Sequence, residues 1–240
     1  MRPPRLPPSR LFQAPSFIVL LATLAAIVLM PFLFAGGSRL LASRRLAIER
    51  DVYRARIDSA YTQPMDSGSV VLKDVMLYDH FVPLQHVVGD TTMWSSTNEW
   101  LRDSFPQLSA DARTDFRVRT ADTSSIMAAM IASGAAAGTE PGLPFPHTRA
   151  HIQLLDDSTL AQFFSLSHRH ASGWTEFRAA YPNGTGIVSL SRIGLSRDRL
   201  WAIAYVGQSW HWGDVVGRVY VLHRRGGEWR IVKSRVLWTS

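Results

Sequence analysis

Four residues near the end of the chain could together bind a ligand. Trp210, His211, Trp212 and Asp214 stand together in one short run. Two indoles around an imidazole offer a stacking surface for a sugar ring or a peptide, with the Asp214 carboxylate as a hydrogen-bond acceptor. The alternative is that both indoles fold back over a sheet as a lid on the core. The run is therefore the first candidate ligand site.

Arg192 is a second candidate ligand-binding residue because it stands among apolar residues of a predicted strand. A buried guanidinium has to be paired, and Glu176 and Asp198 are candidate partners. The other role open to Arg192 is recognition of an anionic ligand. The sequence favours the structural ion pair.

His168 and His170 form a His-x-His pair, which is a weak candidate for a metal site. On a strand both imidazoles would face one side, and His211 or Glu176 could complete a zinc site. The segment joins two predicted helices, however, where residues i and i+2 do not share a face. No metal site and no cofactor are predicted.

The motifs that define common enzyme classes are absent from the sequence. There is no phosphate-binding loop, no dinucleotide fingerprint and no zinc-protease helix, and the run from Gly207 to Trp210 lacks the second glycine of a hydrolase elbow. The chain contains no cysteine, which excludes disulfides and cysteine-ligated zinc. We expect a non-enzymatic binding or structural role, with a hydrolase of unrecognised active site as the alternative.

Four apolar-rich runs at the end of the chain predict the sheet that would carry these residues. They span 186–196, 200–206, 218–224 and 228–238, and Gly226-Gly227 between the last two is a strong hairpin signal. Four sequential strands with short connections predict an antiparallel β-meander. The stretch 207–216 is expected to be a longer connection.

The second run divides its side chains by size between its two faces. Trp201, Ile203 and Tyr205 point one way, whereas Ala202 and Ala204 point the other. Small side chains would let another layer approach the sheet closely. We therefore expect a second element to pack on the alanine face.

Helices are expected to complete an α+β domain over residues 69–240. The predicted strands before the meander are 69–78 and 151–155. The predicted helices, the first two separated by Pro106, are 98–105, 109–117, 124–133, 158–166 (starting at Ser158) and 172–180. The Ala-, Gly- and Pro-rich stretch 134–147 is expected to be a mobile loop.

An apolar segment near the start of the chain predicts a membrane anchor. Residues 1–10 are basic and expected to be disordered, and residues 11–38 carry no charge. About 20 apolar residues suffice for a bilayer-spanning helix, so 11–38 is predicted to be a signal anchor. The alternative is a signal peptide over 17–37 that is cleaved near Ala35.

The segment 39–61 predicts an amphipathic helix beside the membrane. Apolar residues recur at three- and four-residue spacing, and arginines occupy the rest. Arg39, Arg44 and Arg45 are expected to meet lipid headgroups. The helix could instead pair with another helix as a membrane-plane scaffold, or pack on its own domain.

The net charge of +7 has its origin in this N-terminal arm. Residues 1–56 hold nine arginines against Glu49 and Asp51, so the remainder is neutral overall and nucleic-acid binding is not expected. Within the remainder, residues 57–162 are acidic and 163–240 are basic. Either the two parts attract each other, or the sheet offers a basic face to an acidic ligand.

The C-terminal third also carries a resemblance to a family of uncharacterised bacterial exported or membrane-anchored proteins. It rests on Trp174, Phe177 and Tyr181-Pro182, followed by the motifs at 186–196, 202–207, 217–222 and 227–229. The resemblance implies export and a strand-rich end, and it supplies no catalytic residue. Members with paired cysteines between Gly207 and Gly217 would staple that loop, which this chain cannot do.

The side of the membrane on which the domain lies is predicted in two opposite ways. More arginines follow the apolar segment than precede it, which favours a cytoplasmic C-terminal side. Long domains cross largely regardless of such charge, and the resemblance points outward. We therefore expect a single-pass inner-membrane protein whose C-terminal domain lies outside the cytoplasm and binds an unknown envelope ligand or protein.

Overall fold

The computed structural model describes residues 42, 44–64, 70–72, 74–82, 91–121, 123, 150–165 and 170–240. Arg44–Ser240 forms one compact unit. The predicted anchor, the predicted helix 124–133 and the predicted loop 134–147 lie outside the described residues, as do Arg39 and His168. Within those described ranges, no helix has the length and apolar character needed to cross a bilayer.

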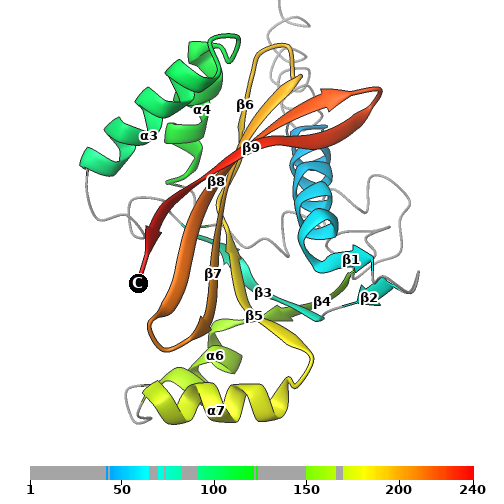
Figure 1. Cartoon of the computed structure of the whole chain (residues 1–240), viewed down its shortest axis with the longest axis vertical. Helices are drawn as coiled ribbons and strands as arrows, with labels where there is room; N and C mark the ends of the chain where they lie inside the picture. The colour runs from blue at the N-terminus through cyan, green and yellow to red at the C-terminus, as the bar shows by residue number, and fades with distance from the viewer. Residues whose placement is uncertain are drawn as a thin grey trace, which may run out of the picture. The chain divides into compact units, whose positions relative to one another are not determined.

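A mixed sheet of seven strands forms the centre of this unit (Figure 1). The strand order is β4-β3-β5-β7-β8-β9, and β6 pairs with β7. β3 runs parallel to both β4 and β5, whereas every later pairing is antiparallel. The strands are β3 (Asp74–Phe81), β4 (His151–Leu155), β5 (Gly184–Leu190), β6 (Gly194–Leu195), β7 (Trp201–His211), β8 (Asp214–Arg225) and β9 (Glu228–Thr239).

The α+β class and the antiparallel C-terminal strands are confirmed, since β5, β7, β8 and β9 follow one another across the sheet. The predicted first strand, 186–196, is wrong as a single element, because β5 ends at Leu190 and β6 begins at Gly194. The predicted strand 151–155 is also confirmed as β4. The predicted strand 69–78 is instead divided into β2 (Val70–Leu72), which pairs with β1 (Thr62–Pro64), and β3. The parallel pairings of β3 were not predicted, because local alternation does not encode which strands become neighbours.

The long connection predicted over 207–216 is wrong. β7 continues to His211 and β8 begins at Asp214, so the turn between them has only two residues. Gly213 adopts φ +82° there, a conformation that suits a tight hairpin. Backbone pairing continues through Gly207↔Gly217 and Ser209↔Val215 although the apolar alternation fades, which is why the sequence pattern suggested a loop.

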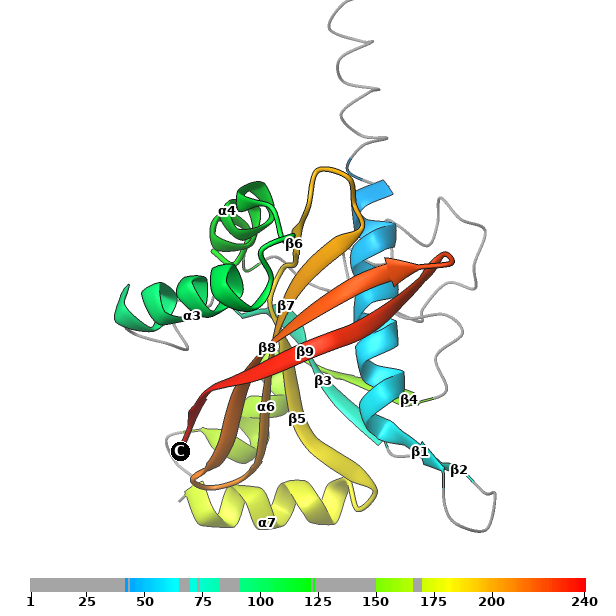
Figure 2. The ribbon, with the colours of Figure 1, turned by 45° about the horizontal axis from the view of Figure 1, so that its top comes forward.

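The helix of residues 44–61 covers one face of the sheet. Ala202 and Ala204 are fully buried in the same cluster as Val52, Tyr53 and Ile57 of this helix. The predicted close approach on the alanine face is therefore confirmed. In Figures 1 and 2 the sheet separates this helix from α3 (Thr91–Ser104) and α4 (Ala110–Arg119).

The opposite face of the sheet is covered by two pairs of helices. α3 and α4 pack on Ile203 and Tyr205 of β7 together with Val219 and Val221 of β8. α6 (Asp157–Phe164) and α7 (His170–Ala180) lie at the other end of this face, where their aromatic side chains cluster with Met76.

The predicted helices lie close to the observed ones, with different starts. α3 begins at Thr91, ahead of the predicted 98, while α4 and α7 fall near their predicted ranges. α6 begins after Asp156, whose carboxylate accepts a 2.7 Å hydrogen bond from the Thr159 amide. Asp156, and not Ser158, is therefore the residue that caps this helix.

A buried ion pair fixes the 44–61 helix to the sheet. The Arg192 guanidinium donates a 3.0 Å hydrogen bond from Nε to Oε1 of the Glu49 carboxylate, and its Nη2 lies 2.9 Å from Oε2 as an ion pair. The Ile193 amide donates to the same carboxylate at 2.8 Å, and the Tyr53 hydroxyl donates to the Ser191 carbonyl. Burial raises the pKa of Glu49, and the Arg192 charge opposes that rise.

Arg45 connects this helix to α4. Its guanidinium lies 2.5 Å from the Asp115 carboxylate and donates a 3.0 Å hydrogen bond to the Ile193 carbonyl. The Asp115 carboxylate in turn accepts from the Leu195 amide at 2.8 Å. Of the arginines expected to meet lipid, Arg44 is exposed and Arg45 has this ion pair.

The Glu49–Arg192 pair gives a prediction about stability. Glu49→Ala leaves the Arg192 charge buried without its carboxylate, so the free energy of unfolding should fall by about 3–5 kcal/mol. The measurement is urea unfolding of the full chain in detergent, followed by tryptophan fluorescence. Glu228→Ala, in a pair whose side chains are 70% and 74% exposed, is the control and should cost less than about 1 kcal/mol. Equal losses in the two variants would contradict the prediction.

Candidate ligand-binding site

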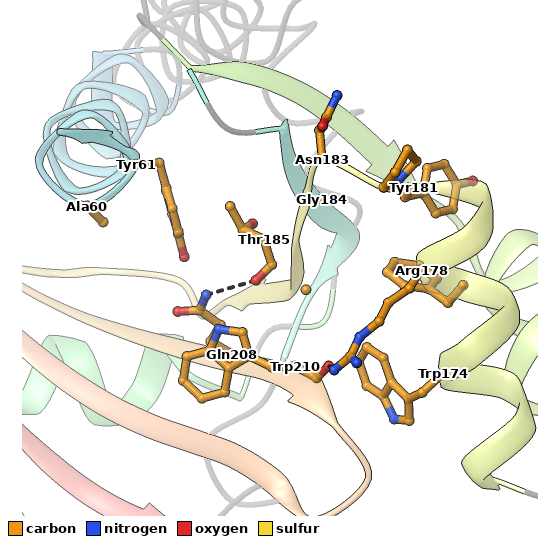
Figure 3. A pocket seen from close by; sticks show the side chains of 13 residues that line it. Ala60, Tyr61, Trp174, Arg178, Tyr181, Asn183, Gly184, Thr185, Gln208 and Trp210 are labelled. Carbon is orange, nitrogen blue, oxygen red and sulfur yellow. Dashed lines mark hydrogen bonds between the residues drawn. The ribbon is translucent and has the colours of Figure 1, made fainter. Parts of the chain in front are cut away.

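A cavity of about 650 Å³ lies beside the sheet where β5 begins and β7 ends (Figure 3). Its walls come from the C-terminal end of the 44–61 helix, from α7 and the turn that follows it, and from the two strands. The lining residues are Ala60, Tyr61, Trp174, Phe177, Arg178, Tyr181, Pro182, Asn183, Gly184, Thr185, Gly186, Gln208 and Trp210.

Aromatic rings form the α7 wall of the cavity. Trp174, Phe177 and Tyr181 follow one another at three- and four-residue spacing, which places them on one face of α7 and its C-terminal end. The Phe177 ring lies 5.6 Å from the Trp174 ring and 4.9 Å from the Tyr181 ring, centre to centre. Because this face packs into an aromatic cluster, the wall is rigid before any ligand arrives.

Two of the lining residues have a buried hydroxyl group without a hydrogen-bond partner. Tyr61 is 7% exposed and Thr185 is 9% exposed, and neither hydroxyl is hydrogen bonded. Figure 3 shows the Tyr61 ring extending from the helix toward Gln208 and Thr185. Burial raises the pKa of Tyr61 to about 12, so its hydroxyl stays protonated and can donate. An unpaired buried hydroxyl is costly, and a polar ligand atom would satisfy it.

Side-chain to backbone hydrogen bonds hold the walls together. Gln208 donates from Nε2 to the Thr185 carbonyl at 3.1 Å, which joins β7 to β5 (Figure 3). Arg178 donates from Nη2 to the Trp210 carbonyl at 2.8 Å, which joins α7 to β7. The geometry of the cavity therefore depends on how β7 is held to both β5 and α7.

Trp210 is the predicted ligand-binding residue that lines this cavity. His211, Trp212 and Asp214 lie exposed at the adjoining hairpin turn, outside the lining, and His211 Nδ1 is 3.0 Å from the Trp212 carbonyl oxygen. The alternative that both indoles cover the core is wrong, since Trp210 is 40% and Trp212 57% exposed. Of the predicted run, Trp210 therefore belongs to the cavity wall, and the other three residues belong to the hairpin turn.

Arg192 is not among the residues that line this cavity. It is 7% exposed, and the buried carboxylate it contacts belongs to Glu49, which the sequence reasoning did not consider. The expectation of a buried structural ion pair is confirmed, and the partner was missed because it lies 143 residues earlier in the chain.

The histidine candidates for a metal site receive no further support. His170 is the first residue of α7, and His168 lies outside the described residues. Searching the described part of the chain finds no group of three or more His, Cys, Asp or Glu residues able to hold a metal ion.

Sequence reasoning missed several residues that the structure brings to the cavity. Tyr61, Thr185 and Arg178 were not singled out, although Trp174 and Tyr181 belong to the residues that carry the family resemblance. The spacing of aromatic residues along α7 was a usable signal. Nothing in the sequence placed the end of the 44–61 helix beside β5.

Compared with protein-family models, with curated proteins and with solved structures, the chain gives no match. The family resemblance of its C-terminal third therefore stays a prediction, and the cavity has to be interpreted from its own geometry.

Two glycines with positive φ give a prediction about the cavity wall. Gly186 has φ +83°, and an added Cβ would lie 2.2 Å from the Ser209 carbonyl oxygen across the β5–β7 pairing. Gly213 has φ +82° with open space around it. Gly213→Ala should therefore cost about 1–2 kcal/mol of unfolding free energy from backbone strain alone, and Gly186→Ala distinctly more, because the strands must also separate.

Urea unfolding of both variants measures this difference. The Gly186→Ala protein should also show altered tryptophan emission, because Trp210 adjoins the displaced backbone. If the two variants lost the same stability, the close approach at Gly186 would be wrong.

Proposed function

We propose that the domain is a non-enzymatic binding module of the bacterial envelope and that the cavity holds a sugar ring or a short peptide. The observation that carries the proposal is the pair of buried, unpartnered hydroxyls, Tyr61 and Thr185, in an open cavity walled by aromatic rings. A few polar groups without hydrogen-bond partners, placed in a cavity with rigid aromatic walls, are suited to binding a polar ligand.

The composition of the wall supports stacking combined with hydrogen bonding. Trp210 offers an exposed indole face, and the hydroxyls can bind ring oxygens, amides or hydroxyls of a ligand. The titratable side chains among the described lining residues are Arg178, Tyr61 and Tyr181. These groups suit recognition, whereas the alternative envelope hydrolase would need a proton-transfer group within reach of its substrate.

The proposed location comes from the sequence. The uncharged segment 11–38 and the family resemblance support a single-pass inner-membrane protein whose domain lies outside the cytoplasm. Lipid headgroups are the proposed partners of Arg39 and Arg44. A long exposed stripe on residues 41–61 would favour the alternative of a membrane-plane scaffold, and Val52, Tyr53 and Ile57 of that range are instead buried in the domain.

Binding can be tested with two tryptophans that stand two residues apart. The probe is an oligomer of β-1,4-linked N-acetylglucosamine, which offers sugar rings and amides together, titrated against the full chain in detergent and followed by tryptophan fluorescence. Trp210→Ala removes an indole from the wall and should weaken binding about 10-fold or more, as expected for loss of a stacking contact of about 1.5 kcal/mol or more. Trp212→Ala is the matched control and should leave the affinity within about twofold.

Three results would count against this reading. Equal effects of the two substitutions would remove Trp210 from the site. Failure of this probe and of a panel of short peptides to bind would overturn the proposed ligand classes. Shortening of the oligomer during the titration would favour the hydrolase.

The proposed location predicts the behaviour of a reporter fused after Ser240. A reporter that is active only outside the cytoplasm should be active when the fusion is expressed in a bacterial host, because long domains cross the membrane despite flanking arginines. Activity of the fusion is measured in intact cells. An intact, membrane-bound and silent fusion would put the domain in the cytoplasm and overturn the envelope role.

A further inference from the structure

A second hollow of about 210 Å³ adjoins the aromatic cavity and has a different chemistry. The two share Gln208 and Trp210 as lining residues. The second hollow is lined by Arg56, Val206, Gln208, Trp210, Val216, Arg218 and Tyr220. Two of these side chains carry a positive charge and none carries a negative one.

Strand pairing brings the floor of this hollow to one face of the sheet. Val206 pairs with Arg218 and Gln208 pairs with Val216 across β7 and β8. Residues two apart on a strand share a face, so Arg218 lies on the same face as Tyr220. Arg56 comes from the 44–61 helix, which covers this face. The two guanidinium groups therefore reach the hollow from different elements.

Arg56 is an unusual residue because its charge is buried and no ion pair with a described carboxylate accompanies it. It is 8% exposed, and its Nε has no hydrogen-bond partner. Its guanidinium carbon lies 4.4 Å from the centre of the Tyr220 ring and 5.7 Å from that of Tyr61. These cation–π contacts orient the group, and they leave its hydrogen-bond donors free to bind an acceptor.

Arg218 adds a second charge to the same hollow. It is half-buried, and within the described residues neither Arg218 nor Arg56 has a carboxylate within ion-pair distance. A buried positive charge without a counter-charge is costly, and two in one hollow repel each other. Binding of an anion would relieve both costs at once, and planar guanidinium groups fit oxyanions through paired N–H donors.

We propose that Arg56 and Arg218 form a binding site for an oxyanion, either a carboxylate or a phosphate group. The excess of basic residues over 163–240 is consistent with such a site on this face. Because the hollow shares two lining residues with the aromatic cavity, one ligand can place a ring in the cavity and an acidic group between the arginines. This assignment to one ligand rests on the proposed function, while the oxyanion site itself does not.

The test uses the full chain in detergent and two probes, sodium phosphate and sodium acetate, each titrated at constant ionic strength against sodium chloride. Binding is followed by the shift in Tm and by tryptophan fluorescence, since Trp210 lines the hollow. At least one oxyanion should raise Tm with saturation. Arg218→Gln should raise its Kd about tenfold or more, the loss expected for a charge-assisted hydrogen bond.

Two further variants complete the comparison. Arg56→Gln should abolish the response, and because its folding is more at risk, Arg218→Gln keeps the proposal testable on its own. Arg230→Gln, at an exposed ion pair on β9, is the control and should respond as the natural protein does. A phosphate response alone identifies a phosphate-bearing ligand, and an acetate response alone identifies a carboxylate.

Two outcomes overturn the proposal: no saturable response to either oxyanion, and a response that is unchanged in both Arg218→Gln and Arg56→Gln. The sugar titration is scored separately. Oxyanion binding without binding of sugar or peptide would keep this site and refute the proposed function, and the reverse result would refute this site alone.

Discussion

The arrangement of this domain depends on one buried ion pair between Glu49 and Arg192. Each charge alone would be expensive to bury, and together they join the 44–61 helix to the loop between β5 and β6. The amide of Ile193 and the hydroxyl of Tyr53 add hydrogen bonds on either side of the pair. The helix is thereby fixed in both position and rotation on the alanine face of the sheet.

Both hollows follow from that placement, because the same helix contributes to the lining of each. Tyr61, at the end of the helix, lines the aromatic cavity, and Arg56, five residues earlier, lines the basic hollow. Gln208 and Trp210 of β7 stand between them as a shared wall. An aromatic surface next to an uncompensated pair of arginines is complementary to a ligand with a ring and an acidic group. We therefore propose that the two hollows form parts of one binding surface.

The sequence predicted features that depend on near neighbours in the chain. Alternation along β7 separated Ile203 and Tyr205 from Ala202 and Ala204, and the structure buries these pairs on opposite faces. The argument that a charge among apolar residues must be paired correctly predicted a buried salt bridge at Arg192. The argument from alternation failed at the β7–β8 turn, where the backbone pairing is continuous although the residues are polar and aromatic and resemble those of a loop.

The sequence alone predicted features set by residues close together in the chain. These are the strand and helix periods, the hairpin at Gly226-Gly227 and the spacing of Trp174 and Phe177 on α7. The parallel neighbours of β3 and the partner of Arg192 could be identified only from the tertiary structure. Among the residues that line the two hollows, long-range packing also leaves polar atoms of Tyr61, Thr185 and Arg56 buried without hydrogen-bond partners. Periodicity fixes which side a residue faces, whereas burial and pairing depend on contacts between segments that are distant in the chain.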